Sequence, residues 1–113
     1  MSRYITKNFN PDYTVTVGVE FSSKNIYYHG NNKYRIQIWD TAGQESFRSI
    51  IRSFYQKATA VLIIYNIANR KSFERIDEWI NEAKENSEDD VVFVLIGNKN
   101  DEEIKYAKLI DFV

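Results

Sequence analysis

Residues 40–45, Asp-Thr-Ala-Gly-Gln-Glu, combine side chains suited to handling a terminal phosphate. Asp40 is able to hold Mg²⁺ through water, because this ion keeps much of its hydration shell. Gly43 lets its backbone N–H approach a γ-phosphate closely, since no side chain intervenes. Gln44 is suited to orienting an attacking water, which is positioning rather than covalent catalysis. The motif therefore predicts a site for phosphoryl chemistry.

A second polar motif, Asn-Lys-Asn-Asp, occupies residues 98–101. The Asp101 carboxylate is able to accept two hydrogen bonds from the N1–H and exocyclic amine of guanine. Adenine lacks this donor pair and would leave the carboxylate unpaired. Lys99 could lay its alkyl stem along the base, and Asn98 could hold neighbouring loops through its amide. Charged loops produce this pattern by chance now and then, so it is less specific than the six-residue motif.

Thr16 is a third candidate, because its hydroxyl could complete a magnesium shell while its N–H senses the γ-phosphate. Each candidate also has an ordinary interpretation. A lone Thr is more often a plain strand residue, and Asp40 or Asn98 alone is more often a turn or cap residue. Phe9 and Tyr13, considered alone, are more often core or surface aromatics.

The elements that must position these side chains follow from the hydrophobic pattern. Residues 15–28 and 34–40 are β-rich and flank the turn signal His-Gly-Asn-Asn-Lys, which predicts an antiparallel hairpin. Residues 46–57 carry apolar side chains at helical spacing, which predicts a short helix. The short apolar runs 61–65 and 91–97 are typical of strands buried on both faces.

Residues 70–86 predict an amphipathic helix with Asn69 as its N-cap. One apolar stripe contains Phe73, Ile76, Trp79, Ile80 and Ala83. The charged side chains expected largely off this stripe are Glu74, Arg75, Glu78 and Glu82. The sequence of residues 102–113 has a weakly helical pattern and is expected to form a tail.

A hairpin followed by alternating helices and apolar strands indicates an α/β sandwich with a largely parallel sheet. Ligands of such sheets bind beyond the carboxyl ends of the strands. Asp40 and Asn98 are expected just past two strand ends, so both should face that crevice.

Composition narrows the class of protein. A chain of 113 residues with 43% hydrophobic residues and a net charge of −1 is typical of one globular domain and has no basic excess for nucleic acid. The absence of Cys excludes disulfides, thiolate metal sites and a prenylation box within these residues. Neither a signal peptide core nor a membrane-length apolar run is present. We therefore expect a cytoplasmic protein.

With these motifs in order, the sequence resembles the Rab branch of the Ras-like small GTPases. RYITKNFNPDYTVTVGVEF resembles the end of the first helix and the first switch, WDTAGQESFRSIIRSFY the second switch, and GNKND the guanine-specificity loop. The resemblance covers residues 3–101. It implies that residues 1–113 are a partial small-GTPase domain with the Ras-like P-loop three-layer fold.

The resemblance also implies individual roles with GTP or GDP and Mg²⁺ as cofactors. Phe9 would stack on guanine and Tyr13 would close over the phosphates. The remaining nucleotide contacts would be Thr16 and Asp40 at magnesium, Gly43 at the γ-phosphate, Gln44 at the water, and Asn98, Lys99 and Asp101 at the base. Effector and regulator proteins would bind Phe21, Trp39 and Phe54. The chain departs from the family pattern at Ser46, Phe54 and Glu102, where Arg, Tyr and Leu are usual.

The family's phosphate cradle, G-x-x-x-x-G-K-[ST], has no counterpart in these residues, because none of the four glycines precedes a Lys. We therefore expect a fold without its first strand and C-terminal elements, and no membrane anchor. The leading interpretation is a Rab-type switch in vesicle traffic, present as a fragment or truncated product. Alternatives are a nucleotide-free interaction module that keeps the effector surface as a decoy, or a relic without function.

Overall fold

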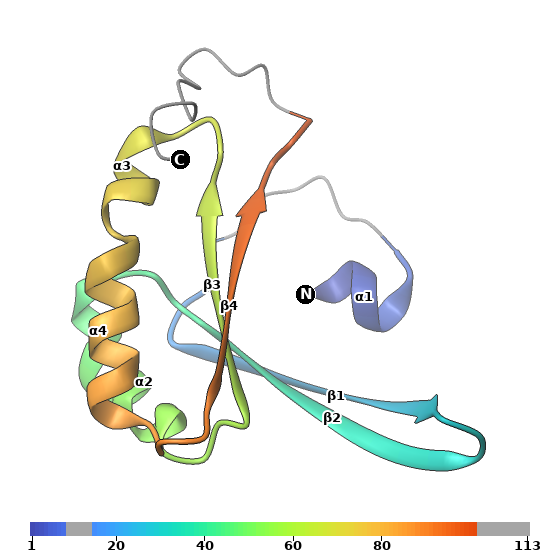
Figure 1. The fold of residues 1–113 in the computed structure, drawn as a ribbon. Helices are drawn as coiled ribbons and strands as arrows, with labels where there is room; N and C mark the ends of the chain where they lie inside the picture. The colour runs from blue at the N-terminus through green and yellow to red at the C-terminus, as the bar shows by residue number, and fades with distance from the viewer. Residues whose placement is uncertain (9–14, 102–113) are drawn as a thin grey trace, which may run out of the picture. The chain divides into compact units, whose positions relative to one another are not determined.

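The computed structural model describes residues 1–8 and 15–101 (Figure 1). The chain divides into two compact units, Met1–Ile51 and Arg52–Val113. Phe9, Tyr13 and the tail from residue 102 onward lie outside the described residues, so their predicted roles stay predictions.

The first unit contains α1 (Ser2–Thr6) and an antiparallel pair of strands, β1 (Val19–Tyr28) and β2 (Asn32–Thr41). The pairing runs from Val19 opposite Thr41 to Tyr28 opposite Asn32, which confirms the predicted hairpin. Its turn is tight because His29 and Gly30 both adopt positive φ angles. The predicted start at residue 15 is wrong: Gly18, with φ of 75°, precedes the strand.

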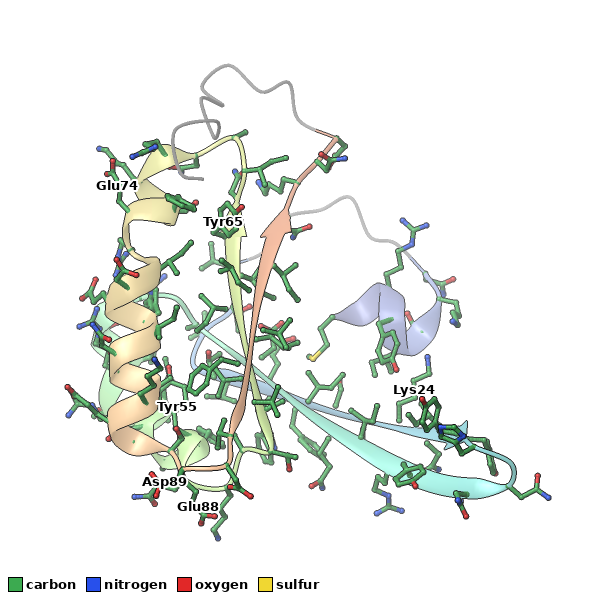
Figure 2. The ribbon with its side chains drawn as sticks, in the orientation of Figure 1. Lys24, Tyr55, Tyr65, Glu74, Glu88 and Asp89 are labelled. Carbon is green, nitrogen blue, oxygen red and sulfur yellow. The ribbon has the colours of Figure 1, made fainter. Side chains whose placement is uncertain are left out.

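Lys24 ties α1 to β1 within this unit (Figure 2). Its Nζ donates to the Tyr4 carbonyl oxygen at 2.6 Å and lies 4.0 Å from the centre of the Tyr4 ring. The short α1 helix ends where Lys7 turns into the left-handed region, with φ of 67°. A helix at this position agrees with the resemblance of these residues to the end of the family's first helix.

The segment after β2 is less regular than the single helix predicted over residues 46–57. A 3₁₀ turn over Glu45–Phe47 precedes α2 (Arg48–Tyr55), which ends two residues earlier than expected. Ile51 of this helix is almost fully buried.

The second unit is a β-α-β arrangement: β3 (Ala60–Asn66), α3 (Arg70–Glu74), α4 (Ile76–Asn86) and β4 (Val92–Asn98). The two strands are parallel, with Ala60 opposite Val92 and Asn66 opposite Asn98. The helices run along one face of the strand pair (Figure 1). A buried cluster joins them, consisting of Val61, Ile63, Ile76 and Ala83.

The predicted helical stripe is confirmed, since Phe73, Trp79 and Ile80 also pack against this cluster. Asn69 is the N-cap, and its side chain accepts a hydrogen bond from the Ser72 N–H at 3.4 Å. The predicted continuous helix is instead divided at Arg75, where φ and ψ are −88° and −1°.

Two burial predictions are wrong. Glu82, expected off the apolar stripe, is only 8% exposed, and its Oε1 lies 3.7 Å from Arg52 Nε of α2. The apolar strands are not buried on both faces: β3 is buried on one face only, with Leu62 and Ile64 52% and 59% exposed, and β4 has no buried residue. The reason is that α3 and α4 cover a single face of a two-stranded sheet in the described part of the chain.

Across the described ranges 1–8 and 15–101, the structure contains no helix that is both long and apolar enough to cross a membrane.

Candidate functional site

The phosphate motif begins inside β2 rather than after it. Asp40 pairs directly with Glu20 of β1 and is half-buried, so its predicted place just past the strand is wrong. Strand pairing continues one step beyond β2, because Ala42 N donates to the Gly18 carbonyl oxygen at 2.8 Å. Ala42 is buried, which anchors the start of the loop that carries Gly43.

Gly43 and Gln44 follow the buried Ala42 and are both exposed. A Cβ placed on Gly43 would meet no atom within 4 Å, so the protein leaves open space at this backbone position. Gly43 is exposed and has no side chain that would keep an anion away from its backbone. Thr16 is half-buried and lies two residues before Gly18, whose carbonyl oxygen accepts the hydrogen bond from Ala42.

The oxygen donors of this unit suit a partly hydrated magnesium ion. Among the described residues, no three His, Cys, Asp or Glu side chains gather closely enough to form a protein-only metal site. Mg²⁺ commonly takes one or two protein oxygens and completes its octahedral shell with water and phosphate oxygens. One carboxylate, from Asp40, and one hydroxyl, from Thr16, are compatible with such a shared shell.

The base motif lies at the carboxyl edge of the parallel pair in the second unit. Asn98 is the last residue of β4 rather than the first residue past it, and its carbonyl oxygen accepts from Ile67 N at 3.1 Å. Lys99 then adopts φ of 64°, so the chain turns sharply away from the strand. Lys99 and Asp101 are both exposed. The prediction that this motif lies at the carboxyl edge of the sheet is therefore correct, although β4 ends at Asn98, one residue later than predicted.

A polar network that sequence inspection missed supports this edge. The Ser72 hydroxyl accepts from Asn66 N at 3.1 Å, and its single proton is shared between the carbonyl oxygens of Asn69 at 2.7 Å and Asn66 at 3.0 Å. Asn66 Oδ1 in turn accepts from Ala68 N at 2.8 Å. The network binds the end of β3 to the first turn of α3, and β3 lies directly beside Asn98. The Asn-x-x-Ser spacing of Asn69 and Ser72 at a helix start was the available signal.

The predicted partner surface is partly assembled. Phe21 and Trp39 face each other across the hairpin, with ring centroids 4.5 Å apart and planes tilted by 42°. Both rings are about half exposed. Phe54 belongs to α2 in the second unit and is half-buried.

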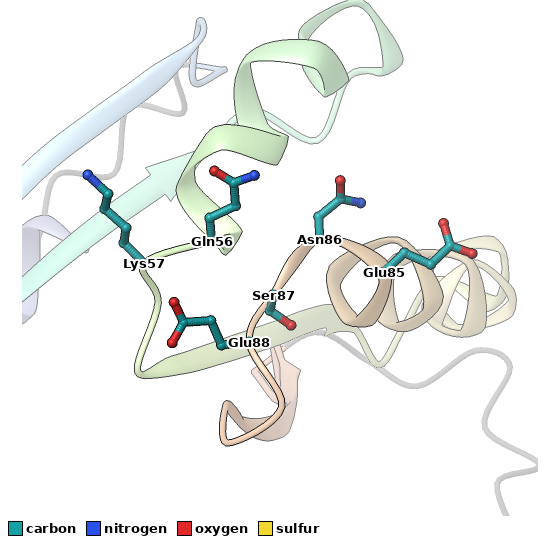
Figure 3. Close-up of a pocket in the computed structure, with 6 residues that line it drawn as sticks. All are labelled: Gln56, Lys57, Glu85, Asn86, Ser87 and Glu88. Atoms are coloured by element: carbon teal, nitrogen blue, oxygen red, sulfur yellow. The ribbon is translucent and has the colours of Figure 1, made fainter.

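An open pocket of about 490 Å³ occurs in the second unit (Figure 3). It is lined by Gln56, Lys57, Glu85, Asn86, Ser87 and Glu88. These residues precede β3 and β4, so the pocket lies at the amino ends of the strands, whereas the base motif follows their carboxyl ends. None of the predicted site residues lines it.

Comparisons with known proteins agree with these motifs. Residues 1–110 match the family model described as Ras family. The chain is 45% identical over 99 residues to Ras-related protein Rab-2B of Dictyostelium discoideum, a match that covers 88% of this chain and 48% of that protein. The chain therefore spans about half the length of this relative. The match to the family model and the identity to a Rab protein together show that the chain belongs to the Ras family of small GTPases and is of the Rab type.

Proposed function

We propose that residues 1–113 form the switch and base-reading part of a Rab-type guanine-nucleotide switch that acts in vesicle traffic. The observation that carries the proposal is the location of the base motif. Asn98 ends β4 directly beside the end of β3, at the sheet edge where α/β proteins bind ligands.

At this edge the exposed Asp101 carboxylate would accept both guanine donors, and the exposed Lys99 stem would cover one face of the base. The Asn98 backbone is already fixed by its bond with Ile67, which leaves the side-chain amide to hold the loop. Discrimination against adenine would arise because its edge leaves the Asp101 carboxylate without donors.

The phosphates would be read by the hairpin unit. The N–H of exposed Gly43 would donate to the γ-phosphate, and exposed Gln44 would orient water for attack on it. Thr16 and Asp40 would hold Mg²⁺, which supplies positive charge that offsets the phosphate charge. Phe9 and Tyr13 would add contacts to the base and phosphates, as the Rab resemblance implies.

Switching would be communicated through the aromatic surface. Phe21, Trp39 and Phe54 would bind effector and regulator proteins, and the exposed contact between Phe21 and Trp39 supports this proposal. We further propose that such a protein acts in the cytoplasm and, at full length, associates with endomembranes, and the Rab resemblance supports this proposal.

The experiment is a titration of a chimera in which a strand bearing G-x-x-x-x-G-K-[ST] precedes Met1. Guanine nucleotides should bind in preference to adenine nucleotides, measured by displacement of a fluorescent GDP. Asp101→Asn should weaken GTP binding and relax this preference, because the new amide places a donor against the donors of guanine. An unchanged preference in this variant would remove Asp101 from the proposed role.

A further inference from the structure

One face of the β1–β2 hairpin is exposed along nearly its whole length. In an antiparallel pair, residues directly opposite each other project to the same side, and every second residue shares that side. The hairpin face defined in this way consists of four cross-strand pairs: Phe21–Trp39, Ser23–Gln37, Asn25–Arg35 and Tyr27–Lys33. All eight residues are exposed, whereas the other side of the hairpin includes half-buried Ile26, Ile36 and Ile38.

All of the charge on this face is positive. Lys33 and Arg35 are its charged residues, and no Asp or Glu of β1 or β2 shares their side of the described ladder. Neither side chain forms a hydrogen bond or ion pair with the residues that the structure describes. The chain as a whole carries a net charge of −1, so the positive charge here is local. Two cations without partners among the described residues are available to an acidic ligand.

The face also has an ordered geometry. From Trp39 to Lys33 the strand covers about 20 Å, with the aromatic pair at one end and the two cations toward the other. Tyr27, 67% exposed, lies beside Lys33 and adds a second aromatic surface. Every second residue of an extended chain projects to one side, so an extended ligand matches the spacing of Trp39, Arg35 and Lys33.

We infer that the hairpin face docks an extended acidic segment of a partner protein, with an apolar or aromatic residue against Phe21 and Trp39 and carboxylates at Arg35 and Lys33. This inference rests on the proposed partner role of the aromatic pair and is independent of nucleotide binding. It adds the chemistry of the partner: an aromatic anchor followed by acidic residues at every second position.

The test uses the 113-residue chain and a random ten-residue peptide library displayed on phage. The library is first depleted on immobilised Lys33→Gln/Arg35→Gln protein, which removes peptides that bind other surfaces, and is then selected on the unaltered chain. Enriched peptides should contain an aromatic residue and two acidic residues that are separated by one intervening residue. The matched control is Lys71→Gln/Lys84→Gln, which removes the same charge from exposed positions of α3 and α4.

Affinities of the enriched peptides, measured by fluorescence polarisation, should fall at least tenfold for the Lys33→Gln/Arg35→Gln protein and less than twofold for the control. Circular dichroism should show both variants folded. A library without enrichment, enrichment without acidic residues, or equal losses in both variants would overturn the inference. If Phe21→Ala binds unchanged while Lys33→Gln/Arg35→Gln loses binding, the acidic contact is supported and the aromatic anchor of the proposed function is wrong.

Discussion

Gly97 of β4 lies against Ile67, the residue that follows β3. A Cβ added at Gly97 would stand 2.8 Å from Ile67 Cγ2 and 3.0 Å from the Tyr65 hydroxyl oxygen. Glycine therefore allows the end of β4 to approach β3 closely, one residue before the base motif begins. The close approach, rather than an unusual backbone angle, explains the glycine at this position.

Gly97→Ala should consequently lower the free energy of unfolding by about 1–3 kcal/mol, because overpacking forces neighbouring atoms apart. Gly43→Ala is the matched control, since its added Cβ would meet nothing within 4 Å. The control should change stability by less than about 0.5 kcal/mol. Urea denaturation of both variants measures the difference, and equal stability would contradict the crowding at Gly97.

Ser72→Ala should destabilise the second unit by about 1–2 kcal/mol, because it removes the hydroxyl that bonds both Asn66 backbone groups. Ser49→Ala on the exposed side of α2 is its control and should be neutral or slightly stabilising, since Ala has the higher helix propensity. Hydrogen exchange at Asn66 should also accelerate in Ser72→Ala. Unaltered exchange would show that the network does not hold the end of β3.

The ion pair between Arg52 and Glu82 should be worth more than a closer pair on the surface. Glu82 is 8% exposed, so its carboxylate is less screened than that of Glu74, which lies 3.0 Å from Arg70 at an exposed site. Double-mutant cycles with Gln replacements should give a coupling near 1 kcal/mol for the Arg52–Glu82 pair and at most about 0.5 kcal/mol for the Arg70–Glu74 pair. The reverse order would show that burial does not strengthen the longer pair.

The uncovered side of the β3–β4 pair should make the 113-residue chain self-associate. Leu62 lies opposite Val94 and Ile64 opposite Ile96, which forms an exposed apolar stripe. Leu62→Thr/Ile64→Thr should reduce the average mass measured by sedimentation at a given concentration. Val61→Thr, on the helix-covered face, should instead unfold the chain. A monomeric unaltered chain with a cooperative melt at high temperature would refute this prediction.

The chain alone should bind GTP with a Kd weaker than roughly 1 μM, because it lacks a phosphate cradle motif. Each charge-assisted hydrogen bond contributes roughly 1.5–3 kcal/mol, so a missing nest of N–H donors and a missing Lys weaken binding by orders of magnitude. Calorimetric titration of the chain with GTP and Mg²⁺ measures this Kd. Tighter binding that Asp101→Asn abolishes would reveal another route to the phosphates.

Local patterns determined much of this protein. The motifs at residues 40–45 and 98–101 identified the family, and the apolar stripe of residues 70–86 predicted the helical face that packs on β3. The hairpin also followed from a β-rich pattern around a Gly-containing turn. These features depend on residue type and short-range spacing, which a single sequence displays directly.

Tertiary structure alone decided which surfaces are covered. Of the two apolar strands predicted to be buried on both faces, β3 has one exposed face and β4 has no buried residue, because coverage depends on elements distant in sequence rather than on the strand's own residues. Glu82 is buried for a related reason: its neighbour Arg52 comes from another helix, thirty positions earlier in the chain. The register that places Phe21 opposite Trp39 likewise arises from strand pairing, since a shift of one residue would turn the side chains of one strand to the other face.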